Sequence, residues 1–165
     1  MYQENNFPDF NSLFNRRPQA RAQINGSILY PEIQGDAWFY QTSSGVLVVA
    51  DIEGLPNPTG NCQSPIFAMH IHEGGSCSGN SADPFANAGM HYNPNNCRHP
   101  YHAGDLPPLF SVNGDAFLAV LTDRFTLNEI IGKTIIIHSS PDDFATQPSG
   151  NSGSKIACGE IRLYT

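Results

Sequence analysis

Short segments of hydrophobic residues recur along the chain, and they include both continuous apolar runs and alternation with polar residues, patterns typical of β-strands. Glycine, proline, asparagine and serine separate these segments, and residues 43–45 (Ser-Ser-Gly) form the turn of a predicted hairpin. The only helical pattern is about one turn at residues 127–131. The predicted strands cover residues 22–25, 27–30, 37–41, 46–52, 67–72, 116–121, 134–138 and 155–164. Seven or eight short strands with two long loops predict an all-β protein, a Greek-key sandwich or barrel.

The strand signals begin at Ala20, whereas residues 1–19 show no clear period. We interpret residues 1–19 as an N-terminal extension and residues 20–165 as one domain, long enough to bury its own core. Charged residues make up 14% of the chain, and the formal net charge is −7 at pH 7. This acidic balance argues against nucleic acid and against an anionic membrane as partners. No apolar run reaches the roughly 20 residues that span a bilayer.

The histidines are clustered. Five of the six lie between Phe67 and Asp105, and the sixth, His138, directly follows the apolar run at residues 134–137. A single histidine is more often a packed or solvated residue than a ligand, but histidines placed for such roles would scatter along the chain. Residues 74–100 and 139–154 are long connections rich in turn residues, and connections of this length are usually kept for function. The cluster therefore predicts a metal site.

One pair of histidines lies in a predicted strand. His70 and His72 are two residues apart, so their side chains share one face at roughly 6–7 Å along the strand. Phe67, Met69 and Ile71 occupy the opposite face, which suits a core. His70 and His72 can therefore converge on one ion.

A second set of ligands recurs at intervals of three. His99, His102 and Asp105 lie in a loop, where a tight turn can bring two imidazoles and a carboxylate together. With one more imidazole they complete a tetrahedral zinc site. His91 lies between the two sets and can serve either metal, or both, because a deprotonated imidazole has two ligating nitrogens. His138 adds an imidazole to the strand pair, and an all-imidazole, four-coordinate tetragonal site suits copper.

Five segments resemble, in the same order, the motifs of the copper-zinc superoxide dismutase family. They are residues 70–73 (HIHE), 89–94 (GMHYNP), 102–106 (HAGDL), 136–143 (IIHSSPDD) and 150–159 (GNSGSKIACG). The resemblance covers roughly residues 20–164. It implies an eight-stranded Greek-key β-barrel, an immunoglobulin-like sandwich, with two long functional loops.

The resemblance also implies a reaction, the dismutation of superoxide to oxygen and hydrogen peroxide at a copper centre that a histidine bridges to a structural zinc. By position, His91 is the bridge, and it would also act catalytically by taking up a proton when copper is reduced. Asp142 matches a carboxylate that links the two metal sites. The copper ligands would be His70, His72, His91 and His138, and the zinc ligands His91, His99, His102 and Asp105.

Lys155 departs from the family pattern, which generally has an arginine at the mouth of the copper channel. Lysine keeps the charge but loses the planar fork that makes paired hydrogen bonds, so we predict dismutation at reduced efficiency with Lys155 receiving the superoxide anion. The alternative function is a non-enzymatic copper- or zinc-binding protein on the same scaffold. A cupin-type metalloprotein is disfavoured because it expects a glutamate a few residues after the histidine pair, whereas Glu73 follows at once.

The four cysteines bear on covalent structure and location. Cys77 and Cys158 match the intrachain disulfide of the family, while Cys62 and Cys97 are additional. We favour a second disulfide, Cys62–Cys97, over free thiols and over a metal-ligand role for Cys97. The lack of a visible signal peptide favours the cytoplasm, whereas disulfides favour an extracellular, cell-surface or spore-surface location. Superoxide is the implied substrate, and the resemblance leaves a homodimer open.

Overall fold

The structure is a computed structural model that describes residues 16–57 and 65–165. These residues form short strands joined by long connections, with one turn each of 3₁₀ helix and α-helix. No helix among them is long and apolar enough to cross a membrane. In chain order the elements are β1 (Ala20–Gly26), β2 (Gln34–Thr42), β3 (Gly45–Glu53), β4 (Ile66–Phe67), β5 (Met69–His72), η1 (Ala86–Ala88), β6 (Leu109–Phe110), β7 (Ala116–Thr122), α2 (Leu127–Ile130), β8 (Thr134–His138), β9 (Lys155–Glu160) and β10 (Arg162–Leu163).

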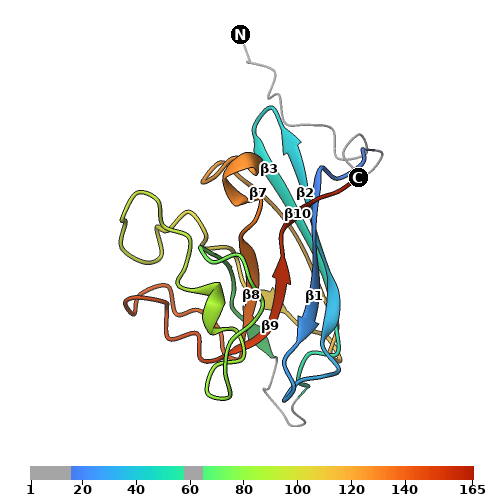
Figure 1. The fold of residues 1–165 in the computed structure, drawn as a ribbon, viewed down its shortest axis with the longest axis vertical. Helices are drawn as coiled ribbons and strands as arrows, with labels where there is room; N and C mark the ends of the chain where they lie inside the picture. The colour runs from blue at the N-terminus through green and yellow to red at the C-terminus, as the bar shows by residue number, and fades with distance from the viewer. Residues whose placement is uncertain (1–15, 58–64) are drawn as a thin grey trace.

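Eight strands form one antiparallel sheet in the order β5-β8-β9-β1-β2-β3-β7, with β10 also paired to β1 (Figure 1). The hairpins β1-β2-β3 follow one another in sequence, while their neighbours β7 and β9 come from later in the chain, which is a Greek-key arrangement. The edge strands of the large sheet are β5 and β7, and a small sheet, β4-β6, lies between them. Only Ala68 separates β4 from β5, and β6 contacts β7. The predicted all-β Greek-key fold is confirmed, as a curled sheet.

The main core lies inside the curl. The predicted inward face of residues 67–72 is confirmed, since Phe67, Met69 and Ile71 belong to this core. The opposite face of the same sheet region is also covered, because Ile136 of β8 and Cys158 of β9 pack against Phe85 and Ala88, which lie in the long segment between β5 and β6. His70, His72 and His138 therefore lie on a sheet face that is covered by loops and shielded from solvent.

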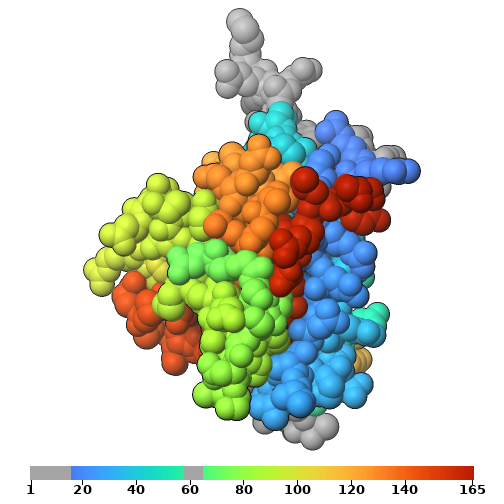
Figure 2. Space-filling model, viewed as in Figure 1, coloured from blue at the N-terminus to red at the C-terminus, as the bar shows by residue number. Residues whose placement is uncertain are grey.

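Two long connections supply this cover, residues 73–108 and residues 139–154. They lie side by side on one flank of the molecule, in green to yellow and in orange-red (Figure 2). Gln147 of the second connection joins them, accepting a hydrogen bond from the His99 N–H (3.0 Å) and donating one to the His99 carbonyl (2.7 Å). Both connections are thus ordered against the sheet and against each other.

One predicted strand was wrong, and one short strand was not predicted. Residues 27–30 form a turn in which the Tyr30 N–H donates to the Ser27 carbonyl (2.8 Å), and Ile28 and Leu29, whose hydrophobicity suggested a strand, are exposed. The two-residue strand β6 was not predicted, because so short a segment carries no alternation. The predicted helical turn is confirmed as α2, whose Thr126 and Glu129 form a capping box.

Candidate metal centre

Four imidazoles from three parts of the chain meet on the covered face of the sheet. His70 and His72 come from β5, His138 from the end of β8, and His91 from the first long connection. One nitrogen of each lies within 4.8 Å of the others, and each residue is at most 4% exposed. We call these four residues the strand group.

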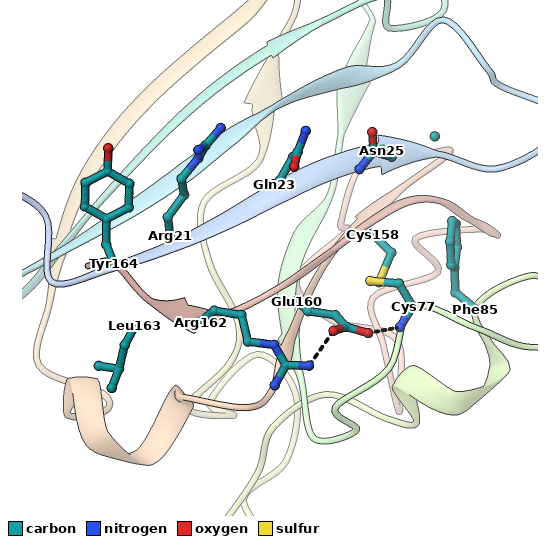
Figure 3. Close-up of a pocket in the computed structure, with 11 residues that line it drawn as sticks. Arg21, Gln23, Asn25, Cys77, Phe85, Cys158, Glu160, Arg162, Leu163 and Tyr164 are labelled. Carbon is teal, nitrogen blue, oxygen red and sulfur yellow. Dashed lines mark hydrogen bonds and ion pairs between the residues drawn. A yellow bond between two sulfur atoms is a disulfide. The ribbon is translucent and has the colours of Figure 1, made fainter.

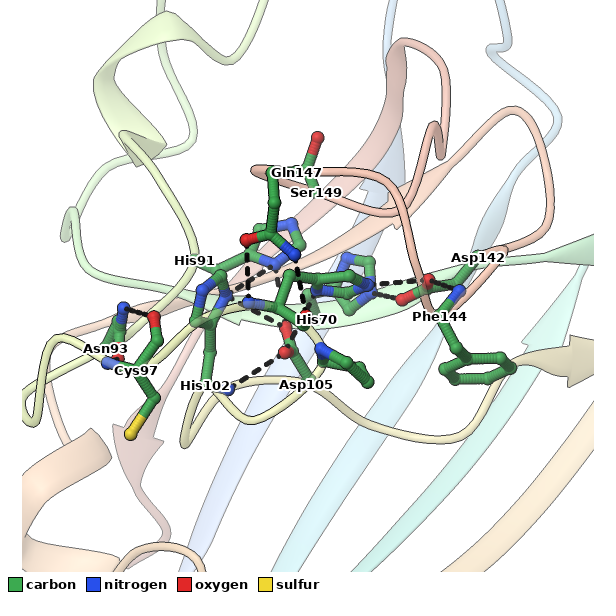
Figure 4. A network of polar contacts seen from close by, with 12 residues as sticks. His70, His91, Asn93, Cys97, His102, Asp105, Asp142, Phe144, Gln147 and Ser149 are labelled. Atoms are coloured by element: carbon green, nitrogen blue, oxygen red, sulfur yellow. Dashed lines mark hydrogen bonds and ion pairs between the residues drawn. The ribbon is translucent and has the colours of Figure 1, made fainter.

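A second set of four includes one residue of the first. His91, His99, His102 and Asp105 each offer a ligand atom, and these atoms also lie within 4.8 Å of one another in a buried setting. We call these residues the loop group. Figure 4 shows His91, His102 and Asp105 converging, with Asp142 on the far side of His70 (Figure 4).

Strand pairing explains how a loop reaches the sheet. His91 lies opposite His72, and Asp105 lies opposite His70, each in an isolated antiparallel bridge to β5. Between them, the Ile71 N–H donates to the Gly104 carbonyl (2.9 Å) and the Ile71 carbonyl accepts from the Tyr92 N–H (2.8 Å). Backbone pairing thus holds His91, the residue that both groups share, beside His70 and His72.

His91 presents one nitrogen to each group. Its Nδ1 lies 2.8 Å from Asp105 Oδ1 and 3.5 Å from His102 Nδ1, inside the loop group. Its Nε2 is buried and has no hydrogen-bond partner in the described part of the chain. A buried polar atom without a partner is costly, so this nitrogen is the observation that best fits a bridge to a second ion.

Other ligand atoms fit metal ions for the same reason. His70 Nδ1 is also buried without a hydrogen-bond partner among the described residues. His99 Nδ1 makes no hydrogen bond there either, but it lies 3.1 Å from Asp105 Oδ2 inside the loop group. His72 Nε2 and His138 Nε2 lie 3.3 Å apart, so both nitrogens can face one ion. The donor sets fit the metals as well, because four imidazoles suit copper and three imidazoles with a carboxylate suit zinc.

For four of the six imidazoles, the other ring nitrogen is held by an acceptor. His70 Nε2 and His99 Nε2 each lie 2.8 Å from a different oxygen of Asp142, which therefore links the two groups. His72 Nδ1 lies 2.9 Å from the Gly89 carbonyl, and His138 Nδ1 lies 3.4 Å from the Gly153 carbonyl. Such acceptors hold the ring orientation and select the tautomer whose free nitrogen faces the metal.

The electrostatics keep these groups in their ligating forms. Burial, together with neighbouring His70 and His91, lowers the pKa of His138 to about 3. Burial likewise lowers the pKa of His72 well below its usual range. Burial alone would raise the pKa of Asp142, but hydrogen bonds from His70, the Phe144 N–H and His99 lower it to about 2. Neutral imidazoles and ionised carboxylates are the forms that bind metals at neutral pH.

Gly150 allows the second connection to fold back closely onto its own Asp142 and onto His99. Its φ of +67° lies in the left-handed region, and a Cβ there would come within 1.9 Å of Asp142 Oδ1 and 2.7 Å of His99 Nε2. Only glycine combines this backbone conformation with the absence of a side chain.

A pocket of about 320 Å³ opens onto the strand group. His72, His91 and His138 line it, with Lys155, Asp83 and residues of both long connections. Among its lining residues Lys155 is the only lysine or arginine. The register of the β8–β9 pair shifts after Ile137. Beyond this shift, Lys155 of β9 lies opposite His138 of β8. A positive charge thus stands in the wall of the pocket beside the imidazoles.

Comparison with known proteins agrees with this geometry. A family model described as copper/zinc superoxide dismutase (SODC) matches residues 33–161. The chain belongs to the copper/zinc superoxide dismutase family.

Three relatives illustrate the range of the copper/zinc superoxide dismutase family. "Superoxide dismutase [Cu-Zn] 2" of Aquifex aeolicus is 36% identical over 146 residues, which cover 79% of this chain and 80% of the relative. "Superoxide dismutase [Cu-Zn]" of Legionella pneumophila is 33% identical over 140 residues, 80% of each chain. "Superoxide dismutase-like protein YojM" of Bacillus subtilis is 36% identical over 111 residues, 58% of this chain and 55% of that protein.

A solved structure supports the fold of the family. The Cu/Zn superoxide dismutase from Brucella abortus superposes with a TM-score of 0.71, covering 86% of this chain and 98% of that chain. The sequence identity is 24%, so this likeness concerns the fold alone.

The disulfide that the family resemblance implied is formed. Cys77 and Cys158 are bonded with their Cα atoms 5.6 Å apart, and the bond fastens the first connection to β9 beside a pocket of about 540 Å³ (Figure 3). The Cys77 N–H also donates to Glu160 (3.1 Å). Cys97 is exposed and belongs to neither ligand group, and Cys62 lies outside the described residues. The Cys62–Cys97 pairing therefore stays a prediction.

The structure brings together all eight residues that the sequence predicted as ligands or as the link between them. Sequence reasoning missed the residues that hold the loops. Asp83, Arg124 and Gln147 make their contacts across the fold, and no spacing in the sequence connects them to the histidines. Gly150 carried a signal, because it begins one of the family motifs.

Proposed function

We propose that this chain catalyses the dismutation of superoxide to oxygen and hydrogen peroxide, with copper held by the strand group and zinc by the loop group. The shared residue His91, with Nδ1 in one group and the unpartnered Nε2 facing the other, is the observation that carries the proposal. Copper, when bound, supplies the one-electron chemistry that superoxide requires. Zinc has no redox chemistry and orders the loop.

The chain's own residues supply anion docking and a proton. Lys155 presents a positive charge in the pocket that His72, His91 and His138 line, and superoxide is an anion. His91 Nε2 can hold a proton whenever it is not coordinated, and the pocket places that proton beside the docked anion. Asp142 and the Gly89 carbonyl keep His70 and His72 oriented throughout.

The test combines metal content with activity. We expect the purified protein, loaded with both metals, to bind one copper and one zinc and to dismutate superoxide in a stopped-flow assay. His72→Gln should lose copper and activity while keeping zinc, because His72 belongs to the strand group alone. His102→Gln should lose zinc preferentially, because His102 belongs to the loop group alone. A protein that binds both metals without activity would contradict the proposal.

One observation favours the second candidate function, a non-enzymatic copper- and zinc-binding protein. The ammonium group of Lys155 lies 2.7 Å from Asp83 Oδ2, so the one cation of the pocket is partly neutralised. Full metal loading with no dismutation above that of the zinc-only protein would select this candidate. Reduced efficiency relative to an arginine at this position remains our expectation for the enzyme.

Two finer proposals concern the setting of the protein. The Cys77–Cys158 disulfide supports residence in an oxidising compartment, which the redox state of the cysteines in freshly lysed cells would test. The homodimer stays a prediction, and light scattering of the metal-loaded protein measures it.

A further inference from the structure

Lys155 is held on two sides before any anion arrives. Its Nζ donates to Asp83 Oδ2 at 2.7 Å and to the Phe85 carbonyl at 3.2 Å. The Lys155 side chain is 15% exposed and that of Asp83 is 39% exposed, so the pair lies in the pocket wall with the carboxylate nearer to solvent. Asp83 and Lys155 both line the pocket that contains His72, His91 and His138.

Asp83 is itself fixed in place. Its Oδ1 accepts the Phe85 N–H at 3.0 Å, which leaves Oδ2 for Lys155. The Asp83 N–H donates to Asn80 Oδ1 (3.1 Å), and the Asp83 carbonyl accepts from the Asn80 N–H (2.9 Å). The carboxylate is therefore part of a folded turn, in the connection that the Cys77 disulfide fastens to β9.

A carboxylate at this place opposes anion binding in two ways. It occupies one of the three donors of the ammonium group, and its charge repels an anion that approaches the same nitrogen. The chain is acidic overall, with a net charge of −7, so no general field compensates for this local loss.

We propose that Asp83 is a positioning residue that shares Lys155 with the incoming anion and so sets how strongly the pocket binds small anions, superoxide included. The inference rests on the proposed function for the identity of the substrate, although the binding of other anions tests it separately. Asp83 thereby acts through Lys155 and does not need to touch the reacting atoms.

Asp83→Asn is the decisive variant, because it removes the negative charge at nearly the same volume, while its one amide oxygen accepts from either Lys155 or the Phe85 N–H. We expect azide to bind the copper(II)-loaded variant about threefold to tenfold more tightly than the wild type at low ionic strength, the effect of removing one charge a few ångströms away in a solvated pocket. The shift of the copper absorption band on azide titration gives the dissociation constant. The value of kcat/KM for superoxide should rise by a similar factor.

Three controls separate this role from others. Asp51→Asn makes the same change in net charge at an exposed position of β3 outside the pocket, so azide affinity should stay near that of the wild type. Asp83→Glu keeps the charge and should also bind azide as the wild type does. In a Lys155→Met background, Asp83→Asn should give a smaller gain, because the competition for the shared cation is absent and only the direct repulsion of the anion is removed.

The outcomes distinguish this inference from the proposed function. Equal or weaker azide binding by Asp83→Asn would overturn the inference, and so would an undiminished gain in the Lys155→Met background. If azide binding tightens but neither protein dismutates superoxide, the anion role of Asp83 stands and the proposed function fails. If the wild type is active but Asp83→Asn changes neither azide affinity nor kcat/KM, the function stands and this inference fails.

Discussion

Asp142 shows how one side chain couples two metal sites. Its Oδ2 lies 2.8 Å from His70 Nε2 in the strand group, and its Oδ1 lies 2.8 Å from His99 Nε2 in the loop group. The Phe144 N–H donates to Oδ1 as well (2.7 Å). Both imidazoles present N–H to the carboxylate when their opposite ring nitrogens bind a metal, and the Phe144 N–H always donates, so Asp142 must act as an acceptor through both oxygens.

Asp142→Asn should therefore weaken zinc binding by about tenfold to 100-fold, the usual cost of losing an acceptor behind a ligating histidine. The amide places its NH₂ group against one of the two N–H groups, so at least one imidazole loses its hydrogen bond. Competition with a coloured zinc chelator measures the affinity. Asp123→Asn, at an exposed carboxylate outside both ligand groups, is the matched control. Equal zinc affinity in both variants would show that Asp142 does not support the ligands.

Lys155 gives the second prediction at this scale. Lys155→Ala should lower kcat/KM by about tenfold or more, because the pocket loses its one cation and the local attraction for an anion. Lys155→Arg should raise it by about threefold, because a guanidinium can keep Asp83 and the Phe85 carbonyl on one edge and offer the other to the anion. Assays at equal copper content make the comparison. An unchanged rate in Lys155→Ala would rule out a docking role.

Prediction from sequence succeeded at this scale where chemistry and spacing coincide. His70 and His72 share a strand face whatever the fold, and the intervals of His99, His102 and Asp105 already indicated a common site. Asp83 could not be found in this way. Its role depends on a turn that folds back onto β9, and an aspartate in a turn is ordinarily a solvated residue that bonds its own backbone.

Among the elements, the first long connection depends on a contact from outside it. Arg124, just after β7, directs Nη1 toward the carbonyls of Pro100 (3.0 Å), Asp105 (3.2 Å) and His102 (3.4 Å). These carbonyls belong to the segment that carries the loop group. One guanidinium thus holds the curvature that brings His99, His102 and Asp105 together.

Arg124→Ala should release zinc faster and bind it about fivefold to tenfold more weakly. This factor corresponds to the loss of one hydrogen bond from a charged donor, which is worth about 1–1.5 kcal/mol in this exposed setting. Copper affinity should change less, because His70, His72 and His138 lie on β5 and β8. Chelator-driven loss of each metal, followed by mass spectrometry, measures both. Arg98→Ala removes an exposed arginine from the same connection as a control. Equal zinc release from both variants would contradict the role of Arg124.

The elements differ in how far the sequence predicts them. Long strands such as β2, β3 and β8 were foreseen because several alternating or apolar residues define each one. Residues 27–30 misled because Ile28 and Leu29 are hydrophobic yet exposed, and the chain turns there to pair β1 with β2. The course of residues 73–108 was beyond prediction, because it follows from the Cys77–Cys158 bond and from bridges to β5.

For the whole molecule, burying the ligand groups without a metal ion lowers the folding stability. Six imidazoles and two carboxylates are buried together, and several ligand nitrogens have no hydrogen-bond partner among the described residues. Metal ions satisfy these atoms, so metal binding should contribute directly to folding stability. In the metal-free protein, these buried imidazoles and carboxylates should therefore determine how stability changes with pH.

We therefore expect the metal-free protein to lose stability as the pH falls from about 6.5 toward 3. The His138 pKa is lowered to about 3 in the folded chain from the ordinary 6.5, so within this window the unfolded chain binds a proton that the folded chain excludes. Each such group lowers the unfolding free energy by up to about 1.4 kcal/mol per pH unit, and the lowered pKa of His70 and His72 acts in the same direction. Asp142 adds a loss of stability only at lower pH, as the pH falls below its ordinary pKa of 3.8 and through its lowered pKa of about 2.

Urea unfolding of chelator-treated protein at pH 7, 6 and 5 measures the slope, and His138→Gln should make it shallower. A flat profile across these pH values would show that the buried imidazoles are protonated or hydrated without penalty in the metal-free fold.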